Sequence, residues 1–354
     1  MLTLGKACTC NEFKFDRDLR ARFEFGGRFG QDSFCCVSHD QQQQFQDDFK
    51  SQFEIVQKRL SAYGWLSPSD ALLPPRVSAG PYQPGADFNV FVSEAYDRSI
   101  ALVPAWLGKR GWMEFPAHRV VAAEASIAHE IVHVLFPNGN RMLAEGLAVY
   151  LQHKLFPEIP VYPNFGDELE ALVAEFIFTN YPKRTPYALW NMDMEVLERS
   201  STPDGLSMRI GRDILVAATN GDPNPAIEAE KFLYAVAGSF VKFLLENPYG
   251  IGGAALTESN FGKLYLKTPL QPLNRNAGDP KRWEDCYKDG TKAYSFKELT
   301  LLWKTYMHFT LCGKFAPNPD KGRQRGLPIP NTPPEKYNDN PLVKTAYAKL
   351  NAIR

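Results

Sequence analysis

Apolar residues recur at helical spacing in many segments of this chain. Where they return every three or four residues, they line one face of an α-helix, and polar residues fill the positions between them. The segments with this spacing are 41–60, 127–135, 141–154, 168–178, 193–199 and 295–311, and 341–353 could form a further short helix. The pattern predicts a chain whose second half is mostly helical.

Three short runs in the first half predict β-strands instead. They are rich in β-branched and aromatic residues and are bounded by turn formers. These runs are 88–92, 100–103 and 111–115. Because the strands precede a long series of helices, the expected fold class is α+β, with a small mixed sheet followed by a mostly helical part.

The helix expected at 127–135 carries a pattern of metal-binding residues. His129 and His133 are four residues apart, so at 3.6 residues per turn both imidazoles project from nearly the same face and can reach one ion. Glu130 lies about 100° round the helix from His129, beside the ion rather than on it. An H-E-x-x-H pattern on a helix indicates a zinc site with the glutamate as general base.

A third ligand is expected on the next helix. The residues 137–140 read P-N-G-N, which favours a turn, and eleven residues separate His133 from Glu145. In an antiparallel helical hairpin, His133 and Glu145 would lie at nearly the same height. Neighbouring helices pack about 8–10 Å apart, a gap that one bound ion can bridge. The spacing therefore predicts one Zn²⁺ held by His129, His133 and Glu145.

Three protein ligands leave a fourth coordination position for water, and zinc lowers the pKa of that water to about 7. Glu130 would accept the water's proton and return it to the leaving group. This pattern predicts a zinc hydrolase. The alternative for the same residues is a buried helix whose histidines and glutamates make ordinary hydrogen bonds.

These residues resemble the gluzincin superfamily of zinc metallopeptidases, in which a glutamate on the following helix is the third ligand. The likeness is closest to the aminopeptidase-like branch, whose third-ligand helix commonly reads W-x-x-E-G-x-A; residues 142–148 read M-L-A-E-G-L-A. The interval between His133 and Glu145 is shorter than is typical there. Val149 stands where thermolysin-like enzymes have an aspartate that orients a histidine. The resemblance implies a gluzincin-type catalytic domain that hydrolyses peptide bonds.

The resemblance also implies two further sets of site residues. Tyr234, near the start of a helix that contains Gly-Ser-Phe, would hydrogen-bond the tetrahedral intermediate, although an aromatic residue at helical spacing is more often part of a core. The strand before the zinc helix would be an edge that pairs with an extended substrate, which makes Trp112, Met113 and Glu114 candidates for substrate binding. Glu114 would bind a substrate ammonium if the enzyme is an aminopeptidase.

Three functions stay open on the sequence. The first is a zinc metallopeptidase, either an exopeptidase or an endopeptidase. The second is a zinc hydrolase of a non-peptide amide or ester, which would use the same water and the same Glu130. The third is a catalytically inactive gluzincin-like binding protein, against which the intact Glu130 argues, because a structural zinc site does not need this carboxylate.

Changes in composition divide the chain into four expected segments. Cysteines cluster in 1–40, the H-E-x-x-H pattern lies in 41–165, and helical periodicity dominates 166–314. The segment 315–354 is expected to be an extended tail, because seven of the 27 prolines fall between Pro317 and Pro341.

Charge and apolar content exclude some partners. Lys plus Arg and Asp plus Glu number 40 each, so the net charge of zero argues against nucleic acid as the main partner. No apolar run reaches the roughly 18 residues of a membrane span. A peptide or protein substrate is the expected partner.

The six cysteines fit disulfides, with Cys286–Cys312 the easiest pairing, or a second metal site formed by Cys8, Cys10, Cys35 and Cys36. No apolar segment of the signal-peptide type is visible at the start. The resemblance nevertheless favours a periplasmic or secreted protein, because relatives with this Tyr and Gly-Ser-Phe pattern are often exported bacterial peptidases.

Overall fold

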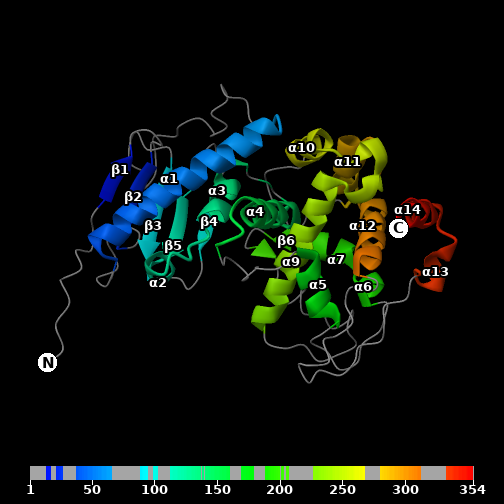
Figure 1. Cartoon of the computed structure of the whole chain (residues 1–354). Helices are drawn as coiled ribbons and strands as arrows, with labels where there is room; N and C mark the ends of the chain where they lie inside the picture. Colours follow the sequence, from blue (N-terminus) through cyan, green and yellow to red (C-terminus); the bar gives the residue numbers. More distant parts are fainter. Residues whose placement is uncertain are drawn as a thin grey trace, which may run out of the picture. The chain divides into compact units, whose positions relative to one another are not determined.

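The computed structural model shows an α+β protein, mostly helical, with a small mixed sheet near its N-terminus (Figure 1). The structure describes residues 13–16, 21–26, 37–65, 88–94, 99–102, 112–136, 138, 140–159, 169–178, 188–199, 201–202, 205–206, 226–267, 280–311 and 332–353. The chain divides into two compact units, Met1–Pro137 with Leu151–Asn164 and Asn138–Tyr150 with Phe165–Arg354.

The first unit contains a five-stranded sheet with the order β1-β2-β3-β5-β4. Its strands are β1 (Phe13–Asp16), β2 (Ala21–Phe25), β3 (Phe88–Ser93), β4 (Ile100–Leu102) and β5 (Trp112–Pro116). The three inner strands β2, β3 and β5 run parallel, and β1 and β4 pair antiparallel at the two ends. The strands expected at 88–92, 100–103 and 111–115 are thus confirmed, and β1 and β2 are additional.

Strand β5 lies inside the sheet, so the expectation that it forms an edge is wrong. Strand β4 precedes β5 in the chain but pairs on its outer side, with Leu102 opposite Trp112 and Ile100 opposite Glu114. On this side β4 occupies the backbone positions that an extended substrate would use along Trp112 to Glu114.

Helix α1 (His39–Ala62) covers one face of the sheet (Figure 1). A capping box starts it, because the Ser38 hydroxyl accepts from the Gln41 N–H and the Gln41 side chain accepts from the Ser38 N–H. Its Phe45 and Phe49 rings meet Phe23 of β2 and Phe115 of β5, with ring centroids 5.3 to 6.5 Å apart. This aromatic cluster is the core between α1 and the sheet.

Helices α2 (Ala117–Val121) and α3 (Ile127–Leu135) follow β5. Every residue of α3 is buried, so the helix that carries the histidines is enclosed by protein. It ends at Phe136, whose ring stacks on Trp65 at 5.4 Å. Helix α4 (Arg141–Leu155) begins soon after, as the periodicity predicts; its residues up to Tyr150 belong to the second unit, and those from Leu151 belong to the first.

The second unit is helical apart from a short hairpin, as far as its described residues show. Its elements after α4 are α5 (Leu169–Phe178), α6 (Ala188–Asn191), α7 (Met194–Arg199), β6 (Ser201–Thr202), β7 (Gly205–Leu206), α9 (Ala226–Glu246), the 3₁₀ turns η3 (Pro248–Gly250) and η4 (Gly253–Ala255), α10 (Glu258–Lys267), α11 (Pro280–Thr291), α12 (Phe296–Leu311), α13 (Glu335–Asn338) and α14 (Pro341–Asn351). The helices expected from the periodicity are confirmed, and α6, α10, α11 and α13 were not expected.

Two glycines let α9 and α4 approach each other closely. A Cβ atom on Gly146 would lie 2.4 Å from the carbonyl oxygen of Ala237, and one on Gly238 would lie 2.6 Å from Cγ1 of Val149. The hydroxyl of Ser239 accepts a hydrogen bond from the Trp303 indole at 3.1 Å. The Gly-Ser-Phe run therefore packs α9 against α4 and α12.

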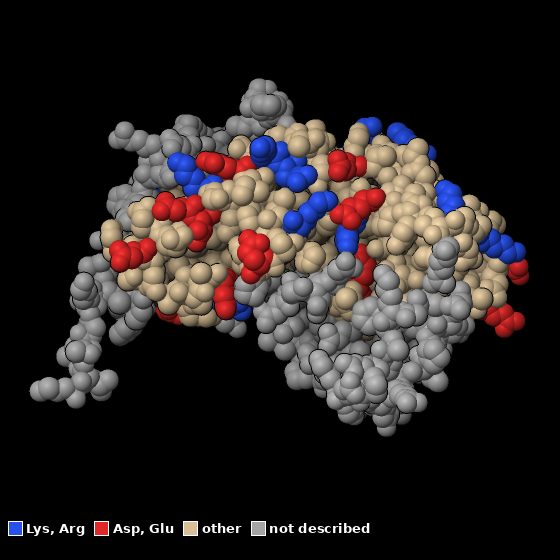
Figure 2. Space-filling view, viewed as in Figure 1, with Lys and Arg blue, Asp and Glu red and all other residues tan. Residues whose placement is uncertain are grey.

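The described surface carries acidic and basic side chains of both signs close to one another, without one extended basic patch on the face drawn in Figure 2. No helix among the described residues has the length and apolar character needed to cross a membrane. Five of the six cysteines lie outside the described residues, and one of them is Cys312, the expected pairing partner of Cys286. The proline-rich segment up to residue 331 also lies outside the described residues. The expectation of an extended tail is wrong for the end of the chain, because α14 is helical and its Val343 and Tyr347 pack with Trp190 in a buried cluster. The rest of the expected division stays a prediction.

Candidate metal centre

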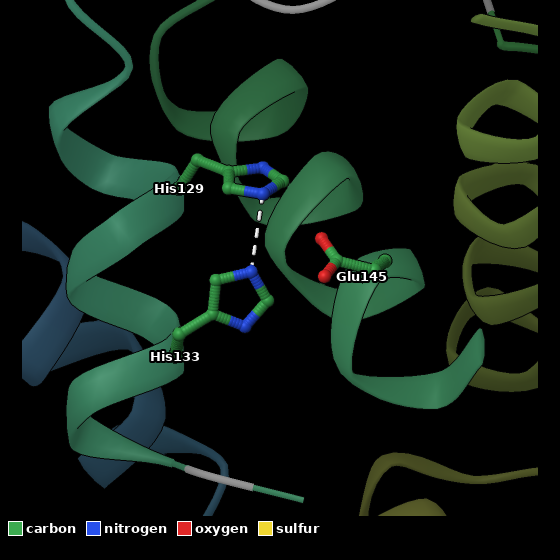
Figure 3. A group of neighbouring side chains, drawn as sticks. All are labelled: His129, His133 and Glu145. Atoms are coloured by element: carbon green, nitrogen blue, oxygen red, sulfur yellow. Dashed lines mark hydrogen bonds between the residues drawn. The ribbon is translucent and has the colours of Figure 1, made fainter. Parts of the chain in front are cut away.

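Helix α3 places its two histidines one above the other, as their spacing predicts. The Nε2 atoms of His129 and His133 are 3.1 Å apart, and the ring planes are inclined by 79°. Both side chains are buried, with 5% and 7% exposure. Figure 3 shows the two rings projecting from α3 toward the same space.

Glu145 of α4 completes the group. Donor atoms of His129, His133 and Glu145 all lie within 4.8 Å of one another, and Glu145 is 2% exposed. In Figure 3 the carboxylate points toward the two imidazoles. Two nitrogens that share one zinc ion at 2.0–2.1 Å lie at most about 4.2 Å apart, so the separation of 3.1 Å is compatible with a shared ion. The three residues can hold a metal ion.

The buried carboxylate of Glu145 has a cationic neighbour on its own helix. The Arg141 guanidinium donates to Oε1 of Glu145 at 2.6 Å, one helical turn away. Removal of a carboxylate from water is costly unless a partner charge and hydrogen bonds replace the water. Arg141 therefore stabilises Glu145 in its charged form, which is the form that binds metal.

A buried asparagine begins the third-ligand helix. The Asn140 side chain accepts from the Leu143 N–H at 3.1 Å, the arrangement of an N-cap, and the Asn140 N–H donates to Asn138 Oδ1 at 2.7 Å. The Asn140 amide also donates to Tyr287 and Glu198. The sequence pattern predicts a turn here. An asparagine immediately before an apolar periodic run, here Asn140 before Arg141–Leu155, is the signal that would have revealed the cap.

Two buried tyrosines near this helix were not expected from the sequence. Burial raises the pKa of the Tyr265 phenol; Arg141 partly lowers it, and Glu145 adds a smaller rise. Burial likewise raises the pKa of Tyr287, and Glu198 raises it further. Both phenols are therefore neutral at physiological pH, and the electrostatic field of the Arg141–Glu145 pair reaches Tyr265.

Side chains from two other helices cap the first turn of α3. The Ala128 N–H donates to Oε1 of Gln52 from α1, and the His129 N–H donates to Oε1 of Gln152 from α4, both at 3.0 Å. The Ser126 side chain, which stands at the N-cap position, makes no capping hydrogen bond. Both glutamines lie outside α3, 76 and 23 residues from the N–H groups that they cap, so the local sequence does not reveal them.

The remaining expected site residues have the following places. Glu130 lies on α3 between the two histidines and is buried. Tyr234 is half-buried on α9, one turn before Ala237, which meets Gly146 beside the third ligand. Tyr234 thus lies on the helix that packs against α4, and its catalytic role stays a prediction.

Trp112, Met113 and Glu114 are buried in β5. The Trp112 ring lies edge-on to Phe91 at 6.1 Å, and Glu114 accepts a hydrogen bond from the Ser93 hydroxyl. Their pairing with β4 removes the edge-strand argument for substrate binding. Direct binding of a substrate by these three residues stays a prediction.

The chain matches no protein-family model, no curated protein and no solved structure.

Proposed function

We propose that this protein is a zinc-dependent metallopeptidase of the gluzincin type. The observation that carries the proposal is the convergence of His129, His133 and Glu145 within 4.8 Å in a buried group. Two histidines and one glutamate form the ligand set of catalytic zinc sites that keep an open position, whereas structural zinc sites usually have four protein ligands.

His129, His133 and Glu145 would hold a zinc ion that supplies Lewis acidity and lowers the pKa of a bound water to about 7. Glu130 would accept the proton from the attacking water and return it to the leaving amine. Glu130 follows His129 on α3, about 100° round the helix axis, which supports this role. Arg141 holds Glu145 ionised.

The coarse fold supports the gluzincin proposal, because a small mixed sheet precedes α3 and helices follow it. Tyr234 is the proposed donor to the oxyanion of the tetrahedral intermediate. The packing of α9 on α4 at Gly146 and Ala237 supports this role, because it brings the helix of Tyr234 next to the residue that follows Glu145.

A second candidate is a zinc hydrolase of a non-peptide amide or ester. The internal position of β5 favours it, because a small substrate needs no free strand edge beside the metal centre. The same Glu130 would act as base.

The test combines elemental analysis with hydrolysis assays on wild type and Glu130→Gln. A mixed peptide library and a set of simple amides and esters serve as substrates. We expect about one equivalent of zinc in both proteins, because Glu130 is not a ligand, and peptide cleavage in the wild type alone.

Equal cleavage by Glu130→Gln would contradict the mechanism, and absence of zinc from the wild type would contradict the metal centre. Hydrolysis of the small amides or esters without peptide cleavage would establish the second candidate. Zinc without any hydrolysis would leave the inactive binding protein as the function.

A further inference from the structure

All four N–H groups of the first turn of α3 have acceptors. The Ile127 and Glu130 N–H groups donate to nearby carbonyls at 2.9 and 3.2 Å. Those of Ala128 and His129 donate to Gln52 and Gln152. These two acceptors are 76 and 23 residues away in the sequence, whereas a helix N-terminus is usually capped by its own adjacent residue. Tertiary contacts therefore set the start of this helix.

The two capping glutamines are closely alike. Each is buried, with 6% exposure for Gln52 and 4% for Gln152, and each offers a neutral amide oxygen at 3.0 Å. A carboxylate at either position would add a negative charge to the protein interior. A neutral oxygen satisfies the backbone N–H without that cost.

Gln152 differs from Gln52 in the helix that carries it. It lies on α4, seven residues after Glu145, which is nearly two full turns and about 10 Å along the axis. Glu145 and Gln152 therefore project from almost the same face of α4. Glu145 on this face is the third member of the metal-ligand group. Gln152 on the same face accepts a hydrogen bond from the backbone N–H of His129, the first member.

The amide nitrogen of Gln152 supports a specific role for the amide oxygen. In the described part of the chain, the buried Nε2 of Gln152 finds no hydrogen-bond partner. A buried donor without an acceptor is unfavourable, so an apolar side chain of similar size would be preferable if packing alone mattered. The hydrogen bond to His129 is the interaction that offsets this cost.

We propose that Gln152 is a positioning residue that fixes where α4 lies along α3, so that His129, His133 and Glu145 converge before a metal ion binds. The inference rests on the proposed metal centre and extends it. Ligands held in place by hydrogen-bonded neighbours bind metal more tightly than ligands that must be ordered by the ion. In this chain the neighbour acts through the backbone N–H of the ligand.

The matched variants Gln152→Met and Gln52→Met test this role. Each removes one amide oxygen from the first turn of α3 and keeps the volume of the side chain, so both should lower Tm by similar amounts. Metal affinity and geometry are measured with Co²⁺, by competition titration and by the visible absorption spectrum. We expect Gln152→Met to weaken Co²⁺ binding by roughly 10- to 100-fold and to change the spectrum. Gln52→Met should leave both as in the wild type.

Gln152→Glu is the rescue variant, because a carboxylate oxygen can accept from the same N–H. We expect its Co²⁺ spectrum to return to that of the wild type, while its Tm stays lower because the added carboxylate is buried. Equal losses of affinity in Gln152→Met and Gln52→Met, or no loss in either, would overturn the positioning role and leave the metal centre standing. A wild type that binds neither Co²⁺ nor Zn²⁺ would overturn both.

Hydrogen exchange of the metal-free wild type tests the proposal without any variant, should Gln152→Met fail to fold. We expect slow exchange at the amides of both Ala128 and His129. Fast exchange at His129 beside slow exchange at Ala128 would show that Gln152 does not hold the helix before metal binding, and would overturn the proposal.

Discussion

Individual residues at the metal centre combine burial with charge. Glu145 is the only one of the three grouped donors that carries a negative charge, and it is nearly inaccessible to water. Its hydrogen bond to Arg141 stabilises the carboxylate in the absence of metal. A bound divalent cation would share this carboxylate with Arg141.

Replacement of Glu145 by alanine tests the third-ligand assignment. Two histidines alone hold zinc weakly, so we expect Glu145→Ala to lower zinc affinity by more than the roughly 10- to 100-fold that loss of a ligand's hydrogen-bond partner costs. The measurement is zinc content after dialysis against a defined zinc buffer. Circular dichroism of the variant serves as the control for folding. Full zinc occupancy in Glu145→Ala would refute the assignment.

Lys304 of α12 is a buried lysine outside the group of metal-ligand candidates. Its ammonium donates to the carbonyls of Trp190 and Met192 at 3.1 and 2.5 Å. Burial lowers its pKa to about 8, and the nearby Asp193 opposes the shift. Between pH 8 and 10.5 the unfolded chain therefore holds a proton at this lysine that the folded chain has lost. Stability contributed by this residue must rise with pH in that window.

Urea unfolding of wild type and Lys304→Met from pH 7 to 10 checks this prediction. We expect the free energy of unfolding of the wild type to rise relative to the variant by about 2–3 kcal/mol from pH 8 to 10, at about 1.4 kcal/mol per pH unit. Buried tyrosines such as Tyr265 are common to both proteins, so their ionisation cancels in the difference. Parallel pH profiles would contradict the lowered pKa.

The short sequence motifs on α4 and α9 contribute to helix packing as well as to the proposed chemistry. Gly146 follows the third ligand, and the Ala237 backbone of α9 lies against it. The E-G-x-A and Gly-Ser-Phe runs are therefore partners in one helix contact.

Gly146→Ala and Gly238→Ala measure the two sides of this contact. The added methyl at 146 would meet backbone atoms of Ala237, so α9 must move, whereas that at 238 would first meet the side chain of Val149. We expect Gly146→Ala to lose about 1–3 kcal/mol of stability through overpacking, and Gly238→Ala to lose less. In both variants the replacement of glycine by alanine also raises helix propensity, which offsets the loss by up to about 1 kcal/mol. Equal free energies of unfolding for the two variants would contradict this view.

At the scale of the whole molecule, the order of the strands was the main departure from expectation. Each strand of the sequence prediction exists, but β4 pairs outside β5 and makes it an inner strand. Strand β2 was not predicted, although Phe23 and Phe25 alternate with charged residues. Such alternation is the pattern of a β-strand. Helices α10 and α11 contain a smaller share of apolar residues than the zinc helix and were not predicted.

The sequence by itself determined the local geometry of this protein. The helical repeat makes His129 and His133 neighbours whatever surrounds them, and periodicity places most helices to within a few residues. Only the tertiary structure decided which elements meet. The contact of Gly146 with α9, the inner position of β5 and the capping of α3 by Gln52 and Gln152 all join residues far apart in the chain. Local spacing contains no information on such pairs, because they form only when a shared core selects one packing among many.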